Sequence, residues 1–138
     1  MRALTLFVLL LLLATQGCAV VAVGAVAAAA AGVTYTMLGP AEKTFNEDYD
    51  TVLAALQKAL AGLDIKTGET KTTEENKRAV LAEIEAYARD LIIKISVERI
   101  TEKATRVVVD ASKKYVIKDA ATAGEILIQT SNNLPKKS

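Results

Sequence analysis

Between Arg2 and Glu42 the chain carries no charged side chain, and this uncharged stretch constrains the protein more than any other feature of its sequence. Its first part has the layout of a secretory signal, in which a short positive region precedes an apolar core and then small residues. Arg2 supplies the positive charge, and residues 4–13 supply the apolar core. The sequence therefore predicts that residues 1–17 direct the chain into or across a membrane.

The only cysteine of the chain follows this apolar core, in the order Thr15-Gln16-Gly17-Cys18. This order resembles the site at which bacterial lipoprotein signals are cleaved and lipidated. The resemblance implies cleavage between Gly17 and Cys18, a lipid on the Cys18 thiol and an acyl group on the new amino terminus. One acyl chain binds a bilayer marginally, whereas several chains anchor a protein stably.

The next stretch, residues 19–33, contains only Ala, Val and Gly. As a helix it would be about 22 Å long, which is shorter than the hydrocarbon core of about 30 Å. If the signal is cleaved, we expect this stretch to lie beside the membrane. If the signal is retained, residues 4–33 form a non-lipidated anchor instead. Ala19 follows the cysteine, and resemblance to the sorting rules of enteric-type bacteria favours the outer membrane, facing the periplasm, over the inner membrane.

The Gly39-Pro40 pair breaks the chain and marks the start of a folded domain. About ninety residues follow, which is enough for a modest hydrophobic core. We therefore divide the chain into a signal peptide (residues 1–17), a lipidated membrane-proximal segment (18–40), an α+β domain (41–134) and a polar tail (135–138).

The inventory of side chains excludes most enzymatic chemistry. The sequence has no histidine and one cysteine, which excludes Ser-His-Asp and Cys-His catalysis, His-ligated or Cys-rich metal sites and an internal disulfide. With 17 basic and 16 acidic side chains and 4% aromatic residues, there is no basic face or stacking platform for nucleic acid. We expect a protein that is not an enzyme and holds no cofactor or metal.

An amphipathic helix is predicted at the start of the domain, because Tyr49, Val52 and Leu56 recur at three- and four-residue spacing. We expect Asn46 to cap its start and Gly62 to end it. The flanking segments read as a short strand that ends at residues 44–45 and an exposed strand over residues 65–72.

Residues 79–88 fit two patterns. Val80, Leu81 and Ile84 lie on one stripe of a helix, whereas Ala82, Ile84 and Ala86 alternate with their neighbours as in a strand. Residues 91–100 alternate strictly, and the Arg89-Asp90 pair forms a turn between runs of similar length. These two observations favour a β-hairpin.

Beyond the hairpin we expect a strand over residues 105–111, with Val107 and Val109 facing the core. Asp119 is then the expected cap of a final helix. The expected buried side of that helix consists of Ala120, Ala121, Gly124, Leu127 or Ile128, and Leu134.

The order strand, helix, antiparallel strands, helix predicts an α+β two-layer sandwich, with both helices on one face of a meandering sheet. The other face of the sheet is then exposed. Its expected residues are Leu81, Glu83, Glu85, Tyr87, Lys94, Ser96, Glu98, Arg106, Val108 and Asp110.

The chain also resembles a family of short bacterial lipoproteins that is catalogued as a domain of unknown function. The shared features are Gly17-Cys18, the Ala/Gly/Val-rich stretch, Thr34-Tyr35, Tyr49-Asp50-x-Val52, Gly62-Leu63-x-Ile65 and the hairpin from Ile84-Glu85-Ala86 to Ile93-Lys94-Ile95. The resemblance spans nearly the whole chain and favours the hairpin. It implies no activity, because the family has none assigned.

Two acidic clusters are candidate sites. Glu83 and Glu85 point to the same side of a strand, and paired carboxylates catalyse proton transfer when one of them is buried. Their side of the sheet should face solvent, so we interpret them as a solvated surface. The second cluster lacks the glycine turn and the terminal glutamate of a calcium loop, so we interpret it as a charged helix start. It comprises Glu47, Asp48 and Asp50.

A small basic cluster, formed by Lys113, Lys114 and Lys118, surrounds Tyr115. A solvated loop explains it, and contact with an anionic surface such as lipid head groups is the alternative.

The function that remains is a non-enzymatic interaction module at the envelope. We expect it to be held on the membrane by its lipid anchor and to recognise an envelope protein or component through its sheet face or edge. The alternative is a carrier of a small lipid-like ligand, held in a cavity between helices and sheet. The residues that would leave room for such a cavity, or simply allow close packing, are the alanines at 54, 55, 59, 82 and 86.

Overall fold

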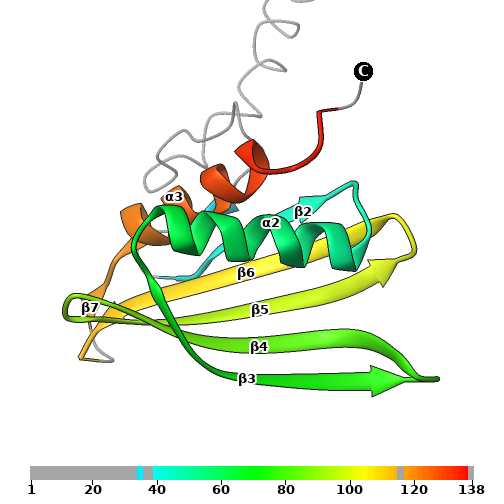
Figure 1. Ribbon diagram of the computed structural model, residues 1–138. Coiled ribbons are helices and arrows are strands. Elements are labelled where there is room, and N and C mark those ends of the chain that lie inside the picture. The colour runs from blue at the N-terminus through cyan, green and yellow to red at the C-terminus, as the bar shows by residue number, and fades with distance from the viewer. Residues whose placement is uncertain (1–33, 36–38, 115–116, 137–138) are drawn as a thin grey trace, which may run out of the picture.

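The computed structural model describes residues 34–35, 39–114 and 117–136. Within these residues, seven strands form one antiparallel sheet and two helices pack on one of its faces (Figure 1). The strand order is β1-β2-β6-β5-β4-β3, and β7 pairs with β6. This arrangement confirms the predicted α+β two-layer fold. The elements are β1 (Thr34–Tyr35), β2 (Ala41–Phe45), α2 (Tyr49–Gly62), β3 (Lys66–Glu75), β4 (Arg78–Ala88), β5 (Leu91–Thr101), β6 (Ala104–Lys113), β7 (Ile117–Lys118) and α3 (Ala120–Asn132).

Strands β3 to β6 form a meander of consecutive hairpins. In the central hairpin Ala88 lies opposite Leu91 and Leu81 lies opposite Glu98, so the predicted hairpin is confirmed. Its turn contains Arg89 in the left-handed region, with φ 53°. The β3–β4 turn contains Asn76 and Lys77, which both have positive φ, as a two-residue turn between twisted strands requires.

The core lies between the sheet and the helices, and the strand period of two builds it. Alternate residues of β4, β5 and β6 point toward the helices and are 0–4% exposed. Val107 and Val109 are among them, as predicted. These strand residues are Ala82, Ile84, Ala86, Ile93, Ile95, Val97, Val107, Val109 and Ala111.

Helix α2 begins two residues later than predicted. Its N-cap is Asp48, not Asn46, because the Asp48 carboxylate accepts hydrogen bonds from the Thr51 amide at 3.0 Å and the Thr51 hydroxyl at 2.7 Å. Asp119 caps α3 as predicted, with the Thr122 amide and hydroxyl at 2.9 and 3.0 Å.

Helix α2 ends at Gly62, but the glycine is not the residue that turns the chain. Asp64 has φ 56°, its amide donates to Ala61, and the Ile65 amide donates to the Leu60 carbonyl at 2.9 Å. This is a Schellman ending, whose left-handed position is usually glycine. The position that reverses the chain is therefore Asp64.

The buried side of α3 is rotated relative to the prediction. Ala121 is exposed, so its predicted burial is wrong, while Gly124 and Leu127 are buried as predicted. Ile126 and Thr130 are also buried, and the Thr130 hydroxyl donates to the Ile126 carbonyl at 2.7 Å. Burying these residues turns the helix so that Ala121 faces solvent.

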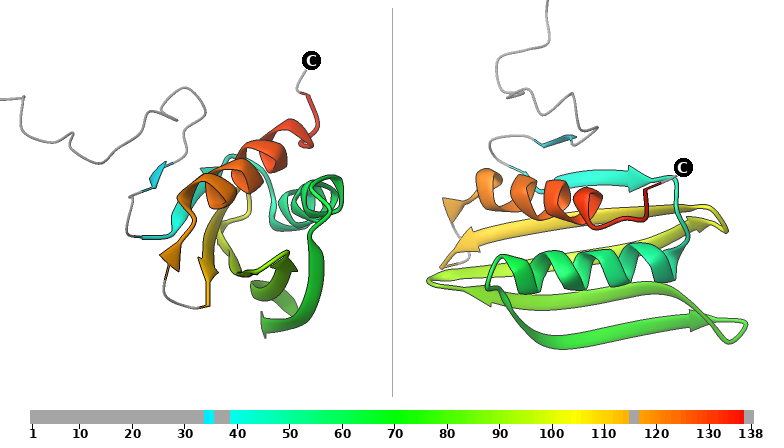
Figure 2. Two further views of the ribbon diagram at one scale, coloured as in Figure 1. Left: turned by 90° about the vertical axis from the view of Figure 1, so that its left-hand side faces the viewer. Right: turned by 45° about the horizontal axis from the view of Figure 1, so that its top comes forward.

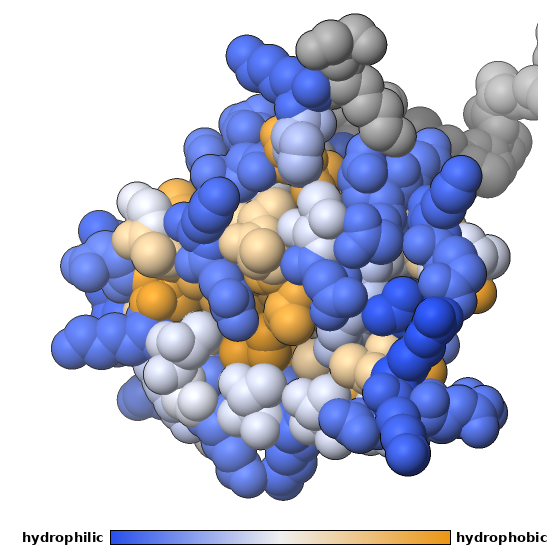
Figure 3. Space-filling model, turned by 45° about the vertical axis from the view of Figure 1, so that its right-hand side comes forward, coloured by the Kyte–Doolittle hydropathy of each residue, from blue (hydrophilic) through white to orange (hydrophobic). Residues whose placement is uncertain are grey.

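The helices do not cover the whole sheet. Helix α3 packs on β2 and β6, and α2 packs mainly on α3 and β5 (Figure 2). All ten residues of β3 are exposed. On one side of the molecule, apolar residues lie in the middle with hydrophilic residues around them (Figure 3).

Neither helix in the described ranges is long and apolar enough to cross a membrane.

Candidate functional site

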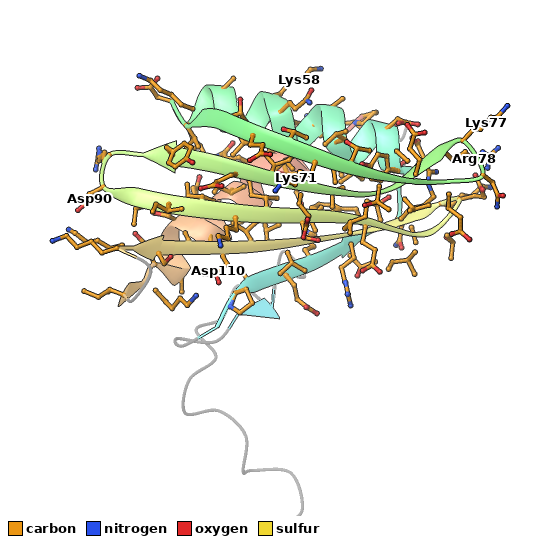
Figure 4. All side chains as sticks on the ribbon, turned by 90° about the horizontal axis from the view of Figure 1, so that it is seen from below. Lys58, Lys71, Lys77, Arg78, Asp90 and Asp110 are labelled. Carbon is orange, nitrogen blue, oxygen red and sulfur yellow. The ribbon has the colours of Figure 1, made fainter. Side chains whose placement is uncertain are left out.

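The candidate site is the sheet face opposite the helices, which we call the open face (Figure 4). Every residue predicted for it on β4, β5 and β6 is half-buried or exposed. What the two flanking strands add could not be predicted from the sequence, because alternation within a strand does not reveal which strand is its neighbour. Glu42 of β2 lies opposite Val108, and Lys71 of β3 lies opposite Glu83.

Charged side chains of opposite sign face each other across the strands. Glu83 lies between Lys71 and Ser96, and Lys94 lies between Glu85 and Asp110. In antiparallel sheets such opposite-charge neighbours attract each other. The open face is therefore a patterned mixture of charges, with no single sign over a large area.

A hollow of about 380 Å³ opens in the middle of this face. Ser96 and Val108 lie opposite each other at its floor. Their side chains are short, whereas Lys71, Lys94 and Glu85 on its rim are long. The hollow therefore forms where two short side chains lie beside longer ones, in their own cross-strand row and in the row of Glu85 and Lys94. The short residues were visible in the sequence, but the register that brings them together was not.

Hydrogen bonds and ion pairs hold much of the rim in place. Lys118 contacts both carboxylate oxygens of Asp110, at 2.6 and 2.7 Å. The Tyr87 hydroxyl donates to Glu85 at 2.7 Å. Surface pairs of this kind contribute at most about 1 kcal/mol each, so their main effect is to order the side chains around the hollow.

The predicted carboxylate pair lies on this face. Glu83 is exposed and Glu85 is half-buried, so both carboxylates remain in contact with solvent. General acid catalysis by a carboxyl group at neutral pH needs a desolvated environment. The position of this pair therefore fits a solvated surface.

The acidic residues at the start of α2 have structural contacts. Asp48 is the N-cap, and Asp50 lies 3.9 Å from Arg99. The Glu47 carbonyl accepts a hydrogen bond from the Thr105 hydroxyl at 3.0 Å. Hydrogen bonds from the Thr51 amide and hydroxyl lower the pKa of Asp48. Among the described residues, no group of three or more acidic side chains is arranged to hold a metal ion.

The predicted basic cluster lies at one end of the sheet, and two of its lysines are in ion pairs. Lys113 pairs with Asp90, and Lys118 pairs with Asp110. Lys114 is exposed in a turn with φ 49°. Tyr115 lies outside the described residues, as do Gly17 and Cys18 of the predicted lipidation site.

Comparison with known proteins leaves the open face without an assigned activity. No curated protein matches the chain. A family of proteins of unknown function, DUF3568, matches residues 2–114, which include the apolar amino-terminal stretch and strands β1 to β6. The chain therefore belongs to the DUF3568 family.

Proposed function

We propose that the protein is a bacterial envelope lipoprotein, anchored through Cys18 to the outer membrane and facing the periplasm. Its domain is a non-enzymatic interaction module, and its open face binds an envelope protein. The observation that carries the second part is the hollow over Ser96 and Val108, in a sheet face that no described helix covers.

The position of the amino-terminal segment supports this arrangement. Strand β1 is the first described element, and it pairs with the start of β2, where Thr34 lies opposite Glu42 and Tyr35 opposite Ala41. The segment that leads to the anchor therefore joins the domain at one edge of the sheet. Apart from Pro40, which precedes β2, the residues that line the hollow lie on β3 to β6, away from that edge strand.

The opposite edge is a poorer binding site than the face. Strand β3 has register irregularities at Thr67/Thr70 and Thr73/Glu74, and it carries Lys66, Glu69, Lys71, Glu74 and Glu75. Bulges and charged side chains are the usual means by which an edge strand avoids pairing with another chain. We therefore place the partner on the open face.

Packing of the alanines supports an interaction module over a lipid carrier. Of the five alanines that would leave room for a ligand, four are 0–2% exposed within the core, namely those at 55, 59, 82 and 86. Small residues at these positions let the helices lie close to the sheet. Ala54 is exposed and lines no space between the layers.

The anchor is tested by replacing Cys18 with Ser in the full-length gene. We expect the native chain to lose residues 1–17, gain acyl mass and fractionate with the outer membrane, whereas the variant keeps its signal or lacks the acyl mass. An unchanged intact mass and membrane association in Cys18→Ser contradicts lipidation. A native chain that retains Met1 to Gly17 supports the rival anchor over residues 4–33.

The open face is tested by site-specific photo-crosslinking in cells. A photoreactive amino acid at Ser96 probes the floor of the hollow, and the same residue at Lys58, which is exposed on α2 away from this face (Figure 4), is the matched control. We expect a reproducible protein adduct from position 96 that is absent from position 58. Equal adducts at both positions, or co-purified lipid without a protein adduct, contradict the proposal.

A further inference from the structure

The edge of the sheet nearest to the amino-terminal segment carries an unusual hydrophobic residue. Ile117 in β7 is 65% exposed, the highest value for a large hydrophobic side chain among the described residues. Single exposed apolar residues are common. Ile117 differs because the exposed Lys114 lies three residues before it, whereas the adjacent Lys118 is held in an ion pair with Asp110.

Strand β7 lies on the same side of β6 as the strand that leads to the anchor. β2 pairs with β6 from Thr105 to Val109, and β7 pairs with Ser112 and Lys113 of the same strand. Two residues of β6, Asp110 and Ala111, lie between the two pairings, so the nearest paired positions are about 10 Å apart along the strand. Ile117 and the start of the described chain therefore lie on one edge of the sheet.

We propose that this edge rests on the lipid surface, with the Ile117 side chain inserted at the level of the acyl–headgroup boundary and Lys114 among the phosphates. An exposed apolar residue with a lysine nearby suits this boundary, because a lysine stem covers apolar surface while its ammonium group reaches the headgroups. The inference extends the proposed membrane anchor by giving the domain a fixed orientation on the bilayer.

The charge at this end of the sheet favours binding to anionic lipid only weakly. This end of the sheet carries Arg89 and the three lysines of the basic cluster together with Asp90, Asp110 and Asp119, and two of the lysines are already paired. One excess positive charge attracts anionic lipid only modestly. Insertion of Ile117 therefore has to supply much of the contact, and the dependence on anionic lipid should be partial.

A weak contact suffices because the tether holds the domain near the membrane. The fifteen residues 19–33 span at most about 50 Å when fully extended. Confinement of this kind turns binding into an intramolecular event at high effective concentration. The opposite edge offers no comparable contact, since β3 contains no large apolar residue.

The experiment uses the full chain, purified from membranes and reconstituted in vesicles of phosphatidylethanolamine and phosphatidylglycerol. Ile117→Cys carries an environment-sensitive fluorophore, and Thr72→Cys, on exposed β3, is the matched control. We expect a blue-shifted emission at 117 and several-fold stronger quenching by nitroxide lipids than at 72. Equal quenching at the two positions overturns the proposal. A blue-shifted emission at 117 without quenching by nitroxide lipids also overturns it, because the probe is then shielded by protein and not by lipid.

A second variant distinguishes insertion of the sheet edge from the affinity of the fluorophore itself for lipid. Lys114→Glu in the Ile117→Cys background should reduce quenching in vesicles with phosphatidylglycerol and change it little in phosphatidylcholine vesicles. Equal quenching with and without this change in the anionic vesicles overturns the role of Lys114 among the phosphates.

The number of labels distinguishes this inference from the lipidation on which it rests. A lipidated Cys18 thiol cannot react, so each variant chain should take up one label. Two labels per chain contradict lipidation. If the domain is held on the membrane in that case too, the comparison of quenching at positions 117 and 72 still decides whether the edge contacts lipid.

Discussion

The guanidinium carbon of Arg99 lies 5.0 Å from the centroid of the Tyr49 ring. Arg99 comes from β5 and Tyr49 is the first residue of α2. The Arg99 side chain is 14% exposed, and its Nε donates to the Ala79 carbonyl of β4 at 3.0 Å. One cation therefore joins the start of the helix to two strands, through a cation–π contact and a hydrogen bond.

Replacing Tyr49 with Phe should stabilise the protein. The Tyr49 hydroxyl is buried, and no group in the described part of the chain hydrogen-bonds to it. An unsatisfied buried hydroxyl costs free energy, whereas the ring and its contact with Arg99 remain in the variant. We expect the free energy of unfolding in urea at pH 8 to rise by about 1 kcal/mol. A less stable variant would show that the hydroxyl has a partner.

The same variant should flatten the alkaline loss of stability. Burial, together with the charge of Asp50, raises the pKa of Tyr49 above its ordinary value of 10.0. The folded state thus favours the protonated hydroxyl, and this contribution is complete below pH 10 and is lost as the pH rises through the folded pKa. The stability gain of Tyr49→Phe should therefore grow between pH 8 and pH 11. A gain that stays constant over this range contradicts the prediction.

The two helix caps should contribute equally. Asp48 and Asp119 each accept hydrogen bonds from the amide and hydroxyl of the threonine three residues later, Thr51 and Thr122. Replacing either aspartate with Ala should lower the free energy of unfolding by about 1 kcal/mol. Asn46→Ala, at the position predicted from sequence, should lower it less. Thermal unfolding of the three variants gives the ranking, and an equal or larger loss in Asn46→Ala would contradict this assignment of the cap.

Acid should weaken the first cap. The pKa of Asp48 is lowered from 3.8 by the hydrogen bonds from Thr51, so its ionised form stabilises the fold above pH 4 and this contribution is lost as the pH falls through the folded pKa. Asp48→Asn keeps an oxygen acceptor but cannot titrate. We expect the wild type to lose more stability than Asp48→Asn between pH 5 and pH 2, measured by urea unfolding. Parallel losses contradict the prediction.

The end of α2 offers two stabilising substitutions. Asp64→Gly relieves a left-handed backbone with φ 56°, and Gly62→Ala fills a helical position where an added Cβ has no neighbour within 4 Å. Each should raise the free energy of unfolding by about 0.5–1 kcal/mol. Asp64→Val should have the opposite effect and destabilise the domain, because a β-branched residue disfavours positive φ. Denaturant midpoints of the three variants test the assignment.

Gly68 should be intolerant of a methyl group. An added Cβ would lie 2.7 Å from the Tyr87 ring and 3.2 Å from the Glu85 carbonyl oxygen. The ring would have to move and lose its hydrogen bond to Glu85, so we expect Gly68→Ala to cost about 1 kcal/mol. Combining it with Tyr87→Ala should recover part of this loss in a double-mutant cycle, because the clash is shared. Strictly additive effects would contradict this explanation.

Alternation along the strands was enough to predict the sheet. Ile93, Ile95 and Val97 are buried and Lys94, Ser96 and Glu98 are not, because a strand sends successive side chains to opposite faces. The period of two therefore predicts which residues belong to the buried layer and which to the open face, without information on which strands are adjacent. The lipidation of Cys18 stays a prediction, since it lies outside the described residues.

Helix ends and short strands were harder to predict. Asn46 and Asp48 are both good cap residues, and the hydrogen bonds of Thr51 decide between them. Similarly, Gly62 is the residue type expected beyond a helix, while Asp64 adopts the required backbone. Strand β7 has two residues, too few to show any period, and its edge position depends on pairing with β6.

The pairing of β2 with β6 also sets an order for folding. Phe45 lies opposite Thr105 and Ala41 opposite Val109, whereas β3 to β6 pair as consecutive hairpins that form from local contacts. During synthesis β2 emerges before β3 to β6, yet its partner β6 is the last long strand to be made. The meander can form before β2 joins it, and the edge of β6 that pairs with β2 stays unpaired until then. We therefore expect β2 to be the last of the strands β2 to β6 to join the sheet.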